Sequence, residues 1–144
     1  MLESKSGEVQ QYVGSLRYDR RLYRHDIAGS IAHARMLGRQ GIIPGEDAKR
    51  IVEGLEAIRG EIERGEFVFD PADEDIHMAV EARLFALIGD TAGRLHTGRS
   101  RNDQIALDIR MYLREETGDI GNALHDLRRA LLELAERNSG VILA

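Results

Sequence analysis

Apolar side chains recur every three or four residues along most of the chain, and short polar segments with glycine separate these runs. This spacing matches one buried face of an α-helix, so the sequence predicts an all-α fold. The first predicted helix begins at Ser15, as its N-cap, and ends at about Leu37. Its apolar face consists of Leu16, Tyr23, Ile27, Ile31, Ala34 and Leu37, opposite a basic face of Arg17, Arg20, Arg21, Arg24 and His25.

A second helix is predicted from about Glu46 to Arg64, between a turn at Pro44 and a stop at Gly65. Its apolar positions form a single stripe, namely Ala48, Ile51, Val52, Leu55, Ile58 and Ile62. Because only a short turn separates this helix from the first, we expect the two to pack as an antiparallel hairpin.

The acidic segment 70–75 predicts the start of a third helix, because carboxylates stabilise the positive end of a helix dipole. We expect this helix to end at Gly89 and to bury Ile76, Val80, Leu84 and Leu87. A last helix is predicted from about Asp103 to Asn138. Its later part carries apolar residues at coiled-coil-like spacing, namely Leu113, Ile120, Leu124, Leu127, Leu131 and Leu134.

The length of the last helix indicates how the chain is organised. At the rise of an α-helix it would extend for about 50 Å, more than one short hairpin can cover. We therefore expect its exposed part to join a helical bundle completed by other segments, from a second copy or from further along the sequence. The predicted domains are an N-terminal arm (1–14), a helical-hairpin N-terminal domain (15–102) and the first long helix of a truncated central helical bundle (103–144).

Composition excludes several classes of protein. Charged residues make up 31% of the chain and aromatic residues 5%, which is typical of helical proteins rather than of β-sandwiches or barrels. The net charge of −5 argues against nucleic-acid and membrane-surface partners. Without cysteine there is no disulfide scaffold, and we expect a cytoplasmic location. We also expect no signal peptide and no membrane span, because no apolar run is long enough for either.

The segment most suited to chemistry is His96-Thr97-Gly98-Arg99-Ser100-Arg101-Asn102-Asp103-Gln104, called segment 96–104 below. Gly98 permits a positive φ, and Ser100, Asn102 and Asp103 are residue types that cap a helix. Arginines beside free N–H groups, at the positive end of a helix, suit a carboxylate or phosphate ligand. A polar helix start with solvated arginines explains the same residues equally well.

Two other places could carry chemistry. Ser15 and Asp19 lie four residues apart on one helix face and could contact a ligand. Helix capping by Ser15 and an ion pair from Asp19 to Arg20 or Arg24 is the simpler interpretation. The run 73–77 joins three carboxylates to His77, but it has neither calcium-loop nor zinc-site spacing. We therefore expect a dipole-matched helix start there, with no metal and no cofactor.

Segment 96–104 resembles the signature loop of the argininosuccinate lyase family, within the fumarase/aspartase superfamily of helical, tetrameric lyases. Four further stretches resemble the same family: Ser15-Leu16-Arg17-Tyr18-Asp19, Asp26-Ile27-Ala28-Gly29-Ser30, Glu74-Asp75-Ile76-His77 and Thr91-Ala92-Gly93-Arg94-Leu95. The resemblance extends from Ser15 to the end of the chain.

The resemblance implies an enzyme of arginine biosynthesis that cleaves argininosuccinate into arginine and fumarate by β-elimination of a C–N bond. It also implies a homotetramer with this small-molecule substrate. Ser15 and Asn102 would hold the substrate. Asp19, Arg101 and His77 would be further binding residues, Arg99 and Ser100 would lie near the site, and Gln104 would support the loop.

Two parts of the family's catalytic machinery are not recognisable in the sequence, namely a histidine in a Gly-Tyr-Thr-His-x-Gln stretch and a mobile serine loop. We therefore expect this chain to supply binding residues but no catalytic residue for proton transfer, and to be inactive alone. Two alternatives stay open. The chain could be a non-catalytic helical oligomerisation or interaction module derived from the lyase scaffold. It could also belong to a superfamily lyase that acts on another succinyl adduct.

Overall fold

A computed structural model describes residues 12, 14–70 and 72–142 of the chain. All regular secondary structure among these residues is helical, which confirms the predicted all-α class. Contacts divide the chain into one compact unit that ends at Ile109 and another that begins at Arg110. The predicted arm 1–14 lies outside the described residues except for Tyr12 and Gly14, and the predicted domain boundary after residue 102 stays a prediction.

The predicted first helix is present but interrupted. It consists of α2 (Leu16–Asp19), the 3-10 turn η1 (Arg20–Leu22) and α3 (Tyr23–Arg39). Its predicted apolar face is directed into the core, with Leu16 and Tyr23 partly buried and Ile27, Ile31, Ala34 and Leu37 buried. His25, which we expected on the basic outer face, is buried instead. The buried face is wider than predicted because α4, α5 and the 3-10 segment 89–96 all pack against α3.

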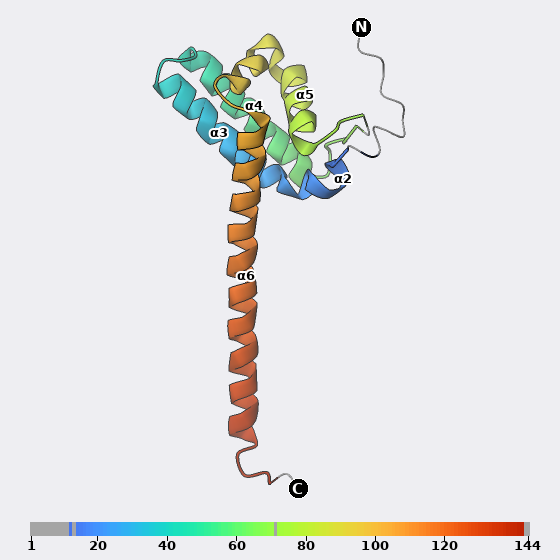
Figure 1. Ribbon diagram of the computed structural model, residues 1–144, viewed down its shortest axis with the longest axis vertical. Coiled ribbons are helices and arrows are strands. Elements are labelled where there is room, and N and C mark those ends of the chain that lie inside the picture. Colours follow the sequence, from blue (N-terminus) through green and yellow to red (C-terminus); the bar gives the residue numbers. More distant parts are fainter. Residues whose placement is uncertain (1–11, 13, 71, 143–144) are drawn as a thin grey trace. The chain divides into compact units, whose positions relative to one another are not determined.

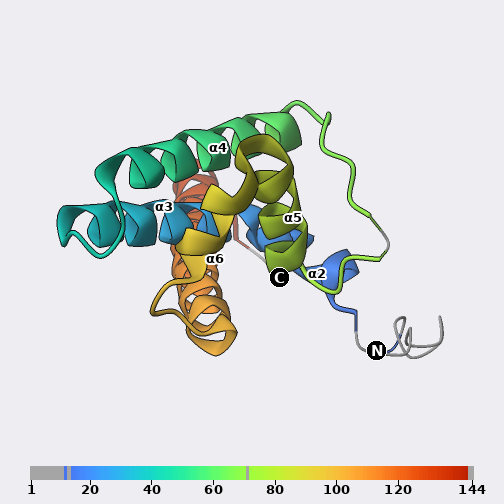
Figure 2. The same cartoon turned by 90° about the horizontal axis from the view of Figure 1, so that it is seen from above.

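The second predicted helix is confirmed as α4 (Gly45–Glu63). It packs against α3 as the expected hairpin, and the two helices lie side by side in Figures 1 and 2. Its stripe forms much of the core, with Ala48, Ile51, Leu55 and Ile58 buried and Val52 and Ile62 partly buried. Gly54 lies so close to α5 that an added Cβ would stand 2.6 Å from Leu84 Cδ1.

The third predicted helix is α5 (Ile76–Ile88), capped by Asp75, whose Oδ1 accepts a hydrogen bond from the Met78 N–H at 2.6 Å. Leu87, which we expected to be buried, is 40% exposed. The buried row runs from Ile76 in steps of four residues, so Ile88 packs on the core in its place. The segment after α5, for which the sequence predicts no helix, forms the 3-10 helix η2 (Gly89–His96) and buries Ala92 and Leu95.

The last predicted helix is confirmed as α6 (Arg101–Arg137), and Figure 1 shows it as one uninterrupted helix. Up to Ile109, within the first unit, it buries Gln104 and Asp108. From Arg110, in the second unit, the six residues of the predicted coiled-coil-like seam are each 53–60% exposed. None of the described helices has the length and apolar composition that crossing a membrane requires.

Candidate functional site

Segment 96–104 connects η2 to α6 and begins the helix in the way its residue types predict. Gly98 has a φ of +65°. Ser100 Oγ accepts a hydrogen bond from the Asn102 N–H at 3.2 Å, and Asp103 Oδ2 accepts one from the Ser100 N–H at 3.3 Å. This reciprocal pair is a capping box, which stabilises a helix start. Ser100 is thus the cap, and α6 begins two residues earlier than predicted.

Two contacts attach this segment to α3. The His33 Nε2 atom lies 3.0 Å from the Thr97 carbonyl oxygen, and Arg99 Nη1 donates to Ser30 Oγ at 3.1 Å. The Nε and Nη2 atoms of Arg99 are buried and have no hydrogen-bond partner among the described residues. Burial lowers the pKa of Arg99, and nearby carboxylates partly oppose that shift. The interpretation of solvated arginines is therefore wrong for Arg99, which is directed inward.

Arg101 is held by acidic and amide groups from two helices. Its Nη2 donates to Glu81 Oε2 of α5 at 3.1 Å, its Nη1 donates to Gln104 Oε1 at 3.0 Å, and its Nε lies 3.9 Å from Asp75 Oδ2. Glu81 Oε1 also lies 3.5 Å from His96 Nδ1. The Arg101 side chain is 30% exposed, so its guanidinium is both oriented and accessible to a ligand.

Ser15 and Asp19 share a face, as predicted, because Ser15 Oγ donates to Asp19 Oδ2 at 2.6 Å. Ser15 occupies the N-cap position of α2, as predicted, but its side chain makes no capping hydrogen bond to that helix. Asp19 Oδ1 instead accepts from the Ile76 N–H at 3.1 Å, and the Ser15 N–H donates to the Glu74 carbonyl at 2.7 Å. Both residues are therefore fixed to the start of α5, where a helix leaves N–H groups unpaired.

A buried cluster lies beneath this surface and consists of Asp26 on α3, His77 on α5 and Asp108 on α6. None of the three side chains is more than 2% exposed. His77 Nδ1 donates to Asp26 Oδ1 at 3.0 Å and lies 3.5 Å from Asp108 Oδ2. Gln104 Nε2 donates to the same oxygen of Asp26.

Burial and charge shift the protonation of this cluster. Burial, followed by the nearby charge of Asp26, raises the pKa of Asp108 to about 7. Burial alone would lower the pKa of His77, but the hydrogen bond to Asp26 and the charge of that carboxylate raise it instead. Burial and the charge of Asp26 therefore favour the protonated form of Asp108 up to about pH 7, and neither oxygen of that carboxyl group has a hydrogen-bond partner among the described residues.

The cluster offers a set of metal ligands, since ligand atoms of Asp26, His77 and Asp108 all lie within 4.8 Å of one another. Asp26 Oδ1, however, already accepts hydrogen bonds from His77 and Gln104. A cation at that oxygen would have to displace both donors, and His77 would have to release the Nδ1 proton. The hydrogen bonds that Asp26 accepts and a protonated Asp108 explain the arrangement without an ion, and the expected absence of a metal stays a prediction.

The seven predicted binding residues belong to one connected region. Ser15 and Asp19 contact the start of α5, Arg101 lies near Asp75 of that same start, and His77 meets Gln104 at Asp26. The exposed Asn102 occupies the first turn of α6, and its side chain makes no hydrogen bond to any described residue. The remaining two are Arg99, directed inward, and Ser100, the helix cap.

Sequence reasoning missed Asp26 and Asp108. The available signal was a polar pair spaced four residues apart within an apolar stripe. Asp26 and Ser30 interrupt the buried face of α3 in this way. Gln104 and Asp108 have the same spacing and are the two buried residues of α6. Such pairs point to buried polar side chains that must find partners on another helix.

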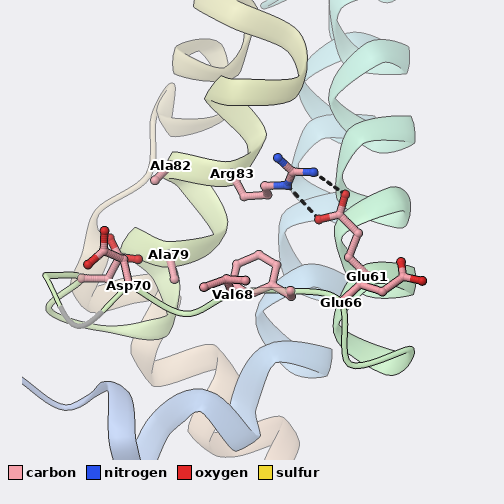
Figure 3. A pocket seen from close by; sticks show the side chains of 9 residues that line it. Glu61, Glu66, Val68, Asp70, Ala79, Ala82 and Arg83 are labelled. Carbon is pink, nitrogen blue, oxygen red and sulfur yellow. Dashed lines mark hydrogen bonds and ion pairs between the residues drawn. The ribbon is translucent and has the colours of Figure 1, made fainter.

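The pocket drawn in Figure 3 lies elsewhere in the first unit. It has a volume of about 470 Å³ and is lined by Glu61, Glu66, Phe67, Val68, Asp70, Asp73, Ala79, Ala82 and Arg83. Arg83 already donates two hydrogen bonds to the Glu61 carboxylate, at 2.6 and 2.8 Å. None of the predicted binding residues lines this pocket, so it is not the candidate site.

The fold and this polar network define an all-α protein with a cationic, capped helix start above a buried carboxyl–histidine cluster. Residues 6–144 match a protein family described as lyase, and the chain belongs to that lyase family. The argininosuccinate lyases of Syntrophotalea carbinolica and Heliobacterium mobile are 56% and 55% identical to it over 135 residues, or 94% of this chain. That of Burkholderia lata is 55% identical over 141 residues, or 98% of this chain.

The matched part is short relative to these proteins. The chain spans 29% of the Syntrophotalea carbinolica enzyme and 30% of each of the other two. The resemblance predicted from segment 96–104 and its companion stretches is therefore confirmed for the N-terminal part of such enzymes.

Proposed function

We propose that the full-length protein is an argininosuccinate lyase of arginine biosynthesis, and that this chain supplies part of its substrate-binding site. The observation that carries the proposal is the identity of about 55% to proteins of that name over nearly the whole chain. The gathering of Ser15, Asp19, Arg101 and Asn102 around the starts of α5 and α6 supports it.

The proposed reaction is a β-elimination on the succinyl part of argininosuccinate. A base removes the proton from the carbon next to a carboxylate, the electron pair of that C–H bond forms the double bond of fumarate, and the C–N bond breaks. The departing guanidino nitrogen takes up a proton and leaves as arginine. Negative charge grows on the carboxylate during proton removal, so oriented cationic and N–H groups at that carboxylate lower the barrier.

The geometry supports a division of roles among the residues. Asn102, exposed and without a side-chain partner among the described residues, is proposed to hydrogen-bond the substrate, together with Ser15. Arg101 is proposed to pair with a carboxylate, because its guanidinium is oriented and accessible.

The other predicted residues are proposed to act close by. Asp19 would orient the Ser15 hydroxyl group through their 2.6 Å hydrogen bond. Ser100 would stabilise, as the helix cap, the first turn of α6 on which Asn102 lies. Arg99 and His77 have inward-directed or buried side chains, so we propose that they support the site from beneath.

We further propose a cytoplasmic homotetramer. The exposed apolar seam from Leu113 to Leu134 supports an assembly in which other helices cover it. The same seam favours the alternative function, a helical oligomerisation module without lyase activity.

An assay of purified full-length protein separates these functions. Argininosuccinate is supplied, fumarate is followed by its ultraviolet absorbance, and arginine is quantified by chromatography. We expect equimolar fumarate and arginine, and none from the 144-residue chain alone. A panel of other succinyl adducts run in parallel tests the second lyase alternative. An assembled protein that cleaves none of the substrates would refute the proposal and favour the oligomerisation module.

A further inference from the structure

The side-chain amide of Gln104 is held in one orientation. Gln104 is 3% exposed, and its Oε1 accepts from Arg101 Nη1 at 3.0 Å while its Nε2 donates to Asp26 Oδ1. A guanidinium can only donate and an ionised carboxylate can only accept. The amide therefore cannot turn over without placing like groups against each other at both ends, and its orientation is fixed by its two neighbours.

Asp26 is a rigid anchor for that amide. It lies on α3 with a side chain only 1% exposed, and the oxygen that accepts from Gln104 also accepts from His77 Nδ1 at 3.0 Å. The anchor thus joins α3, α5 and the first turn of α6. Because every one of these groups is buried, no water competes for the hydrogen bonds, and displacing one leaves a buried polar group unpaired.

The chain of contacts ends at a group that a ligand can reach. Arg101 has the Gln104 amide on one side and Glu81 on another, with Glu81 Oε2 3.1 Å from Nη2. Asp75 Oδ2 is a weaker restraint, at 3.9 Å from Nε, so without the amide the guanidinium would be freer to rotate about its contact with Glu81. The amide adds the second fixed point that an aligned, two-pronged contact with a carboxylate needs.

We propose that Asp26 and Gln104 are positioning residues, and that Asp26 orients the Gln104 amide, which in turn orients the Arg101 guanidinium toward a carboxylate of the substrate. This inference rests on the proposed function for the identity of the substrate. The orientation of Arg101 does not rest on it. The loss of either residue should weaken binding and turnover of a dicarboxylate without either residue touching the ligand.

Gln104→Glu tests the inference with almost no change of shape. The new carboxylate would face the Asp26 carboxylate and repel it, so the contact that fixes residue 104 is lost. The double variant Asp26→Asn, Gln104→Glu should restore it. The amide nitrogen introduced at position 26 has two hydrogens, one for the new carboxylate at position 104 and one for His77 Nδ1 in its other tautomer. That carboxylate then accepts from Arg101 as the Gln104 amide oxygen does.

The first measurement uses the full-length protein. We expect Gln104→Glu to lower kcat/KM for argininosuccinate at least about tenfold, mainly by raising KM, and the double variant to regain most of that loss. Gln40→Glu, the same chemical change at the exposed end of α3, should leave kcat/KM unchanged. A merely structural role for Gln104 predicts no recovery in the double variant, because a second change in the core would add to the damage.

The second measurement does not depend on activity. In ¹⁵N relaxation of the 144-residue chain, the Arg101 Nε–H should be rigid in the wild type and in the double variant and mobile in Gln104→Glu. If the wild-type enzyme does not cleave argininosuccinate, the proposed function fails while this readout still decides the inference. An Arg101 signal as rigid in Gln104→Glu as in the wild type, or a double variant as mobile as Gln104→Glu, would overturn it.

Discussion

Replacing Asp108 by asparagine should make the folded chain more stable at alkaline pH. Asp108 is only 1% exposed, and its Oδ2 lies 3.5 Å from His77 Nδ1, the atom that also contacts Asp26. Burial, and then the charge of Asp26, raise its pKa from an ordinary value of 3.8 to about 7. Asparagine has nearly the same shape and cannot ionise, and its amide nitrogen is a donor, as the hydroxyl group of a protonated Asp108 is.

The sign and size of the effect follow from proton linkage. Between pH 3.8 and about 7 the folded chain keeps a proton on Asp108 that the unfolded chain has released, so the free energy of unfolding falls as pH rises. At about 1.4 kcal/mol per pKa unit, this loss amounts to roughly 2 to 3 kcal/mol between pH 5 and pH 8. The pKa of His77 is also raised, so its contribution is complete below about pH 6.5 and is lost at higher pH, in the same direction.

Urea unfolding followed by circular dichroism at pH 5, 6, 7 and 8 measures this dependence. The free energy of unfolding of the wild type should fall by several kcal/mol from pH 5 to pH 8. That of Asp108→Asn should fall by roughly 2 to 3 kcal/mol less. Asp119→Asn, an exposed aspartate on the same helix, should follow the wild type. If the free energy of unfolding fell equally with pH in the wild type and in Asp108→Asn, the raised pKa of Asp108 would be refuted. An Asp108→Asn variant less stable than the wild type at pH 8 would refute it as well.

Two further outcomes are expected. Gly98→Ala should lower the free energy of unfolding by about 1 to 2 kcal/mol, because alanine is strained at a positive φ. Gly93→Ala, at a position with negative φ and open space, should lower it less. Equal losses in the two variants would count against strain at Gly98. Dialysis against EDTA should leave the thermal midpoint unchanged, because Asp26 Oδ1 already accepts hydrogen bonds from His77 and Gln104 and would have to lose both to bind a cation. A lower midpoint that zinc or manganese restores would show that the Asp26–His77–Asp108 cluster holds a metal.

The helices could be predicted because their signal is local. The stripes of α4 and α5 and the glycines that follow them place each helix to within a few residues. The interruption of the first helix at η1 left no such signal, since Arg20–Leu22 fits an α-helix equally well. The exposure of Leu87 could not be predicted from local sequence either, because whether Leu87 or Ile88 faces the core depends on how α5 packs against other elements.

The site could be predicted only in part. The capping residues and Gly98 act within a few positions of each other, so the form of segment 96–104 follows from its sequence. The buried cluster does not, because Asp26 and Gln104 are 78 positions apart and only the packing of α3 against α6 brings them together. The inward direction of Arg99 depends on Ser30 of α3 in the same way.

The turnover of Asn102→Ala in the full-length protein tests the central claim most directly. Asn102 is exposed, and its side chain has no partner among the described residues, so its loss should leave the fold intact. If segment 96–104 holds the substrate during charge development, kcat for argininosuccinate should fall at least about 100-fold. Asn122→Ala, at an exposed position further along α6, should retain wild-type turnover. An Asn102→Ala enzyme as active as the wild type would contradict the assignment of this segment.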